Sequence, residues 1–149
     1  MSGAHVSLRS AGQIRELWSK TYNTEGAPDW SHIFPCYRED IAFRDSVQTI
    51  SGKAEFEAMC ARLAGRCKAL RMDILSIVME DRTVFMQWEM TMSFKKFPSA
   101  ALFGSTRLLL DEEGLIYDQR DYYDLWGDIF DNIPWMAGGY RRFMRKSFG

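Results

Sequence analysis

Apolar and polar residues follow two different rhythms along this chain, and the change between them divides it into a helical and a strand-rich part. Apolar residues first recur every three or four positions, which is typical of helices that cover a core with one face. The stretches with this spacing run over residues 10–22, 28–34 and 51–65. Between the last two, residues 41–46 alternate apolar with polar and predict a strand.

From residue 69 onward the period becomes two, which predicts consecutive strands. The four predicted strands span residues 70–79, 82–97, 101–110 and 115–126. On the longest strand one face is apolar, consisting of Val84, Met86, Trp88, Met90, Met92 and Phe94. Two short helices are expected after Gly127.

This order of elements predicts the α+β class. We expect a cone-shaped, curved antiparallel sheet wrapped around the N-terminal helices, with an apolar pocket inside the cone. Residues 1–149 are expected to form a single domain, with its core at about residues 11–126 and a helical tail at 128–149. The length suits one domain, because a chain of this size buries roughly 70% of its unfolded surface.

The last predicted strand carries the strongest functional signal. Period two places Tyr117, Gln119, Asp121 and Tyr123 on one face, which is mostly apolar or aromatic apart from its single carboxylate. A carboxylate that points into a dry region is costly unless it is paired, and its pKa tends to rise. Asp121 is therefore a candidate functional acid. Asp45 lies in line with the apolar residues of the first strand and is a second candidate.

Composition narrows the possible partners. The net charge of −1 gives no overall attraction to nucleic acid or anionic lipid, and no apolar run approaches the ~20 residues that span a bilayer. We therefore expect no nucleic-acid and no membrane partner. The first residues lack a secretory hydrophobic segment. The three cysteines lack metal-site spacing, which predicts reduced thiols in the cytoplasm and no metal site.

The sequence also resembles a known superfamily. Residues 37–45 (YREDIAFRD), Gly52 and residues 114–124 (GLIYDQRDYYD), in this order of elements, resemble nuclear transport factor 2-like proteins. The closest branches are the SnoaL-like, limonene-epoxide-hydrolase-like and ketosteroid-isomerase-like proteins. The resemblance implies the cone-shaped fold, a cofactor-free pocket and a homodimer formed through the polar face of the long strand (Gln87, Glu89 and Thr91).

The resemblance gives several positions a role. In the epoxide hydrolases, the acid of the last strand is catalytic, and Asp121 takes its place. Their catalytic arginine and second acid fall near Trp88 and Met90, which cannot do the same chemistry; their water-positioning pair falls at Phe43 and Asp45. In the ketosteroid isomerases the general base falls at Asp45.

Two readings of function follow. If the protein is an enzyme, Asp121 and Asp45 are the expected proton carriers of an isomerase, cyclase or hydratase acting on a small hydrophobic molecule. The alternative is a non-catalytic ligand-binding or protein-interaction domain of the same fold. Under either reading, the expected pocket-lining residues are Trp18, Tyr22, Phe43, Trp88, Met90, Thr106, Tyr117 and Tyr123.

Overall fold

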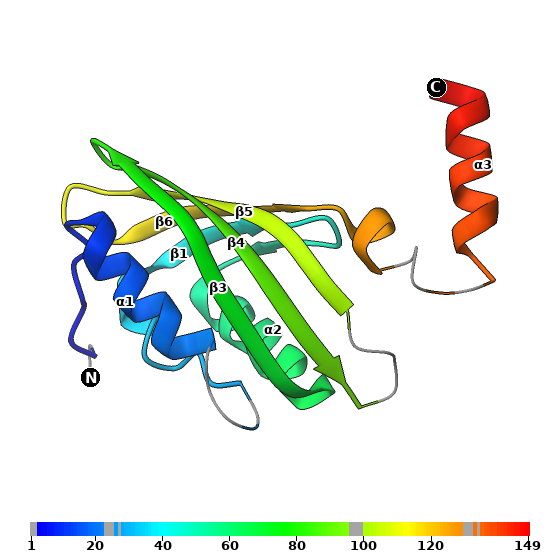
Figure 1. Ribbon diagram of the computed structural model, residues 1–149. Coiled ribbons are helices and arrows are strands. Elements are labelled where there is room, and N and C mark those ends of the chain that lie inside the picture. Colours follow the sequence, from blue (N-terminus) through cyan, green and yellow to red (C-terminus); the bar gives the residue numbers. More distant parts are fainter. Residues whose placement is uncertain (1–2, 23–25, 27, 96–99, 130–132, 134) are drawn as a thin grey trace.

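The computed structural model describes residues 3–22, 26, 28–95, 100–129, 133 and 135–149. A six-stranded sheet curves over two helices, α1 and α2, as Figure 1 shows. The elements in chain order are α1 (Ala11–Tyr22), η1 (Phe34–Cys36), β1 (Tyr37–Arg44), β2 (Thr49–Ser51), α2 (Lys53–Arg66), β3 (Cys67–Glu80), β4 (Thr83–Phe94), β5 (Ala100–Leu110), β6 (Ile116–Tyr123), η2 (Leu125–Ile129) and α3 (Ala137–Phe148). The α+β class predicted from the sequence is confirmed.

The order of strands in the sheet is β2-β1-β6-β5-β4-β3. The strands β3 to β6 form the predicted antiparallel meander. The sheet is mixed rather than wholly antiparallel, because β1 runs parallel to β6 while the short strand β2 pairs antiparallel with β1. The parallel contact is possible because α2, β3, β4 and β5 separate β1 from β6 in the chain.

Helix α1 begins where the sequence predicts it. The Ser10 hydroxyl accepts a hydrogen bond from Gln13 N at 3.1 Å, and the Gln13 side chain accepts one from Arg9 N at 2.8 Å. The first of these bonds satisfies an amide that the first turn leaves without a partner. Ile14 and Trp18 then lie one turn apart on the buried face of the helix.

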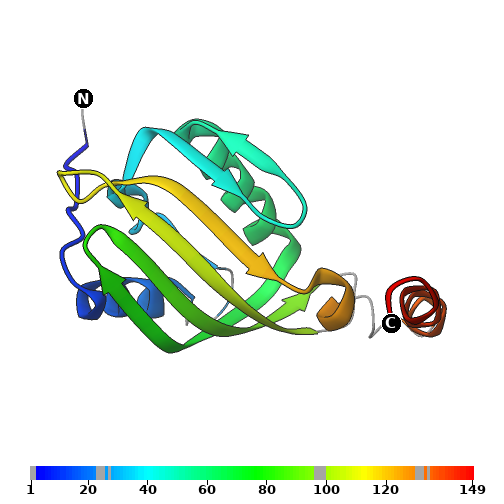
Figure 2. The same cartoon turned by 90° about the horizontal axis from the view of Figure 1, so that it is seen from above.

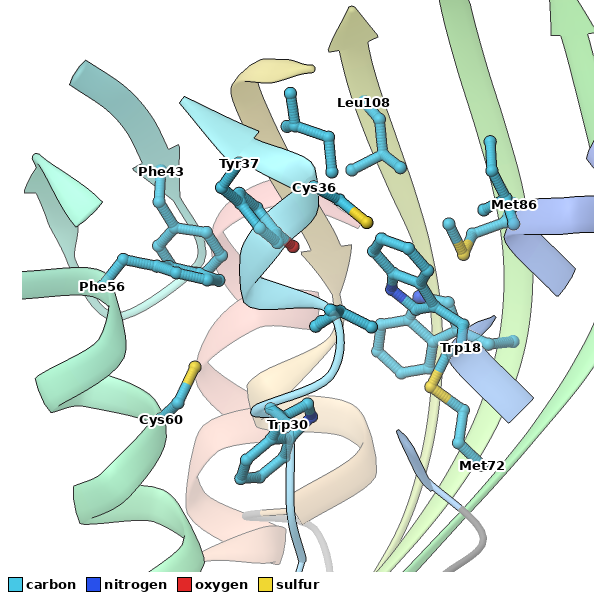
Figure 3. Close-up of a cluster of buried hydrophobic side chains, with 14 of the residues drawn as sticks. Trp18, Trp30, Cys36, Tyr37, Phe43, Phe56, Cys60, Met72, Met86 and Leu108 are labelled. Carbon is cyan, nitrogen blue, oxygen red and sulfur yellow. The ribbon is translucent and has the colours of Figure 1, made fainter. Parts of the chain in front are cut away.

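The predicted second helix is a turn followed by η1, which crosses Pro35. Its apolar positions are nevertheless buried as expected, with Trp30 and Ile33 in the core. Figure 3 shows how this core divides around the chain leading into β1: Trp18 lies near Met72 on one side, and Phe43 and Phe56 face each other on the other.

The alternation on β4 is confirmed, since Val84, Met86 and Trp88 are buried while Phe85 is exposed. Helices α1 and α2 lie beneath the concave face of the sheet, and no described helix crosses the opposite face (Figure 2). Helix α3 stands away from the sheet (Figure 1), with Tyr140 stacked on Trp126 at a centroid distance of 4.9 Å. None of the described helices combines the length and apolar character that crossing a bilayer requires.

Candidate functional site

A cavity of about 460 Å³ lies under the concave face of the sheet, between the strands and α2. Its walls are mainly aromatic rings and methionine side chains, supplied by β1, β3, β4 and β6 and by both N-terminal helices, while β5 adds Leu102 and Thr106. The predicted residues that line it are Trp18, Phe43, Asp45, Trp88, Met90, Thr106, Asp121 and Tyr123. Such a lining, apolar with a few convergent polar groups, is typical of small-molecule sites.

Asp121 lies on β6, in the wall of this cavity. Its Oδ1 accepts hydrogen bonds from the Thr106 hydroxyl at 2.8 Å and from Gln119 Nε2 at 3.1 Å. No described residue donates to Oδ2, which leaves that oxygen available to whatever occupies the cavity. Asp121 is therefore fixed through one oxygen and presents the other.

Two further side chains hold the donors in place. Trp88 Nε1 donates to Thr106 Oγ1 at 2.9 Å, so the threonine hydroxyl proton is directed onward to Asp121. On the other side, the Tyr37 hydroxyl donates to Gln119 Oε1 at 2.6 Å, which orients the amide nitrogen toward the same carboxylate. Thr106 and Gln119 are the buried polar residues of the described core, and both donate a hydrogen bond to Asp121.

The environment raises the pKa of Asp121 to about 6. Burial is the main cause, because the charged carboxylate loses its hydration, and the negative charge of Asp45 adds to the effect. The hydrogen bonds from Thr106 and Gln119 act in the opposite direction, since they stabilise the ionised form. The carboxyl group therefore changes protonation state close to neutral pH.

Asp45 follows β1 and lines the same cavity, as the alternation predicted. Its Oδ1 accepts the backbone N–H groups of Val47 and Gln48 at 2.8 and 2.9 Å, which closes the turn into β2. The Asp45 carboxylate also acts on the Tyr123 hydroxyl, which lines the same cavity. Burial first, and then the charges of Asp45 and Asp121, raise the pKa of Tyr123, so this tyrosine stays protonated.

Tyr117 differs from the expectation. It is 39% exposed and lines a separate surface cleft beside Arg82 and Asp111, with the Arg38 guanidinium 5.9 Å from its ring. The reason is a bulge: Leu110 pairs with Ile116 and Leu109 pairs with Asp118, which leaves Tyr117 as an extra residue on β6. One extra residue exchanges the two faces of a strand, so Ile116 is buried in its place.

The side chain of Tyr22, also expected in the pocket, lies outside the described part of the structure. Several lining residues were not anticipated, among them Trp30, Met72 and the arginines Arg62 and Arg66 of α2. Gln119 could have been found, because the alternation places it on the face of Asp121. Tyr37 could not, because its bond to Gln119 joins residues 82 positions apart.

Cys60 also lines the cavity, and burial followed by the charge of Asp121 raises the pKa of its thiol to about 12. The thiol is therefore neutral and unreactive, as expected of a small core residue. The described residues contain no group of histidine, cysteine and acidic side chains that could hold a metal ion.

Comparisons with known proteins place this geometry in a family context. The model of the SnoaL-like domain family matches residues 15–116. A search of curated protein sequences finds no match. Among solved structures, one similar protein is a hypothetical protein of ketosteroid-isomerase-like fold from Catenulispora acidiphila, determined in complex with trimethylamine. It is 17% identical with a TM-score of 0.67, and the alignment covers 87% of this chain and 95% of that one.

Two further solved structures have the same fold. An LEH-like epoxide hydrolase from M. tuberculosis is 15% identical, with a TM-score of 0.62 and coverage of 92% of this chain and 98% of its own. A candidate SnoaL-like polyketide cyclase from Jannaschia sp. is 18% identical, with a TM-score of 0.66 and coverage of 89% and 98%. At these identities the likeness establishes the fold alone.

Proposed function

The chain belongs to the SnoaL-like domain family, and on this premise we propose that it binds a small, largely apolar molecule in the cavity beneath the sheet and transfers a proton to or from it through Asp121. The supporting observation is the state of that carboxyl group. Its Oδ1 is fixed by Thr106 and Gln119, its Oδ2 has no donor among the described residues, and its pKa is raised to about 6.

These features suit general acid–base catalysis. A proton carrier works best when its pKa lies near the working pH, and when it is oriented before the substrate arrives. Because both donors use Oδ1, the proton of the neutral acid resides on Oδ2, where a carbonyl, hydroxyl or epoxide oxygen of a bound molecule can take it. In the ionised form, the same oxygen can accept a proton from carbon or water.

Asp45 and Tyr123 are the second polar pair of the site. The hydroxyl of Tyr123 lines the same cavity and stays protonated, so it can donate to an oxygen of the ligand while Asp121 transfers the proton. The proposed reaction class is a cofactor-free isomerisation, cyclisation or hydration. These are the reactions that need one proton added at one atom and one removed at another.

The rival function is ligand binding without chemistry, and a specific observation favours it. By resemblance to the epoxide hydrolases, Trp88 and Met90 occupy the positions of a catalytic arginine and a second acid. Trp88 instead donates to Thr106 and forms part of the cavity wall. In this reading, Asp121 orients a ligand by hydrogen bonding and transfers no proton.

One experiment distinguishes proton-transfer catalysis from ligand binding without chemistry. Molecules that co-purify with the protein are first extracted and identified by mass spectrometry. Turnover of these molecules and their close analogues is then compared in the wild type, Asp121→Asn and the control Asp73→Asn, which alters an exposed acid on β3. We expect Asp121→Asn to lower kcat by about 10²–10⁴-fold with little change in ligand affinity, and the control to behave as the wild type. Full turnover by Asp121→Asn would exclude the catalytic role and leave the binding protein.

A further inference from the structure

Two arginines of α2, Arg62 and Arg66, line the cavity although its remaining wall is largely apolar. They are four residues apart and therefore lie one above the other on the same side of the helix. Met59 and Leu63 of α2 also line the cavity. This side of α2 thus combines an apolar surface with two guanidinium groups at the edge of the site.

Both side chains are exposed, and neither guanidinium forms an ion pair or a hydrogen bond with a described residue. Two like charges at this spacing disfavour the helix. A third cation, Lys95, lies beside the same end of α2. Its backbone N–H donates a hydrogen bond to Arg66 O at 3.1 Å. No ion pair with a described residue therefore balances the positive charge at this edge.

The acids of the cavity come from other elements, Asp121 from β6 and Asp45 from the residue after β1. Asp121 shares the cavity wall with Cys60 of α2, and its charge acts on the Cys60 thiol. Arg66 lies six residues beyond Cys60, or about 9 Å along the helix axis at 1.5 Å per residue. A molecule that fills the cavity would therefore contact both the proton carrier and the guanidinium pair.

We propose that the ligand of this cavity is an apolar molecule with an anionic head group, which Arg62 and Arg66 bind at the mouth while the apolar body extends toward Asp121. This inference rests on the proposed function, whose ligand it specifies. Guanidinium groups are suited to this role, because their planar donors match the two oxygens of a carboxylate. The arginines select for charge, whereas the aromatic and methionine side chains select for apolar surface.

The test uses decanoate and decan-1-ol, which share an apolar chain and differ in the charge of the head group. Binding is followed by calorimetry and by the fluorescence of Trp18, Trp30 and Trp88, all of which line the cavity. We expect the wild type to bind decanoate at least about tenfold more tightly than decan-1-ol at pH 7.5, with a preference that weakens as salt is added. The variant Arg62→Gln/Arg66→Gln should lose this preference and bind decan-1-ol as the wild type does.

The matched control is Arg44→Gln, which removes an exposed arginine of β1 that does not line the cavity. It should bind both probes as the wild type does. Equal binding of the two probes by the wild type, or an unchanged preference in the double variant, would overturn this inference while leaving an apolar ligand site in place. Failure of the wild type to bind either probe would contradict both the inference and the ligand-binding part of the proposed function.

Discussion

At the scale of single residues, the buried carboxylate of Asp121 lowers the free energy of unfolding at neutral pH. Its pKa is about 6 in the folded protein against a reference value of 3.8. Because the folded pKa is the higher one, the folded state binds more protons than the unfolded state between about pH 4 and pH 6. The free energy of unfolding contributed by this group is therefore greatest below pH 4 and decreases as the pH rises through 6.

This reasoning predicts that Asp121→Asn stabilises the protein at neutral pH. A shift of about two pKa units corresponds to about 3 kcal/mol, so the free energy of unfolding should rise by about 1–3 kcal/mol at pH 7 and by much less at pH 4. The asparagine oxygen can still accept the bonds from Thr106 and Gln119. Urea denaturation between pH 4 and pH 8 measures the difference, with Asp73→Asn as the control. A variant that is less stable than the wild type at pH 7 would contradict the predicted cost.

The sequence predicted the position of Asp121 because the strand alternation around it is regular. Residues 119, 121 and 123 of β6 all line the cavity, as a period of two requires. The period of two gave the wrong face for Tyr117, because the local sequence pattern does not indicate the bulge that shifts the register there. The hydrogen bonds that fix the Asp121 carboxylate could not be predicted from the sequence either, since Tyr37, Trp88 and Thr106 come from three different strands.

At the scale of elements, the pairing of Trp88 on β4 with Gly104 on β5 determines where the Trp88 ring lies. The two residues are paired in the sheet, and a Cβ atom added to Gly104 would lie 2.4 Å from Trp88 Cη2 and 2.7 Å from the backbone oxygen of Tyr122. Both distances are shorter than real contacts allow. Glycine at this position therefore leaves room for the Trp88 ring, whose N–H donates to Thr106.

We predict that Gly104→Ala lowers the free energy of unfolding by about 1–3 kcal/mol, because the indole or the strand must shift. The comparison variant is Gly65→Ala in the last turn of α2, where nothing lies within 4 Å of the added Cβ. That change should raise the free energy of unfolding by about 0.5–1 kcal/mol, since alanine favours the helix. Chemical denaturation of the two variants tests both signs, and a neutral Gly104→Ala would show that the Trp88 ring is not constrained there.

The regular elements were more predictable than the connections. The strands β3 to β6 and the helices α1 and α2 follow from periodicity, because each buries one face against a single core. The strand β2 was missed, since three residues are too short to show a period. The parallel pairing of β1 with β6 was missed as well, because sequence periodicity specifies which face of a strand is buried and not which strand lies beside it.

At the scale of the whole molecule, the convex face of the sheet carries exposed apolar side chains. Val78 and Phe85 are directly paired on β3 and β4, and are 63% and 44% exposed. Phe103 on β5 is 55% exposed and pairs with Glu89. No described helix covers this face (Figure 2). Rows of exposed apolar and polar side chains on one side of a sheet are typical of association surfaces.

We propose that two copies of the chain associate through this face, because its exposed apolar side chains have no cover among the described residues. A stable dimer buries about 800 Å² on each partner, which requires a broad surface such as a sheet face. Phe85→Glu places a charge in the middle of that surface, and should convert the dimer to a monomer while leaving the far-ultraviolet circular dichroism unchanged. Phe148→Glu alters an equally apolar and more exposed side chain on α3, away from the sheet, and should leave the dimer intact. Sedimentation velocity distinguishes the outcomes: a monomeric wild type would exclude the dimer, and dissociation by Phe148→Glu alone would move the interface to the C-terminal helix.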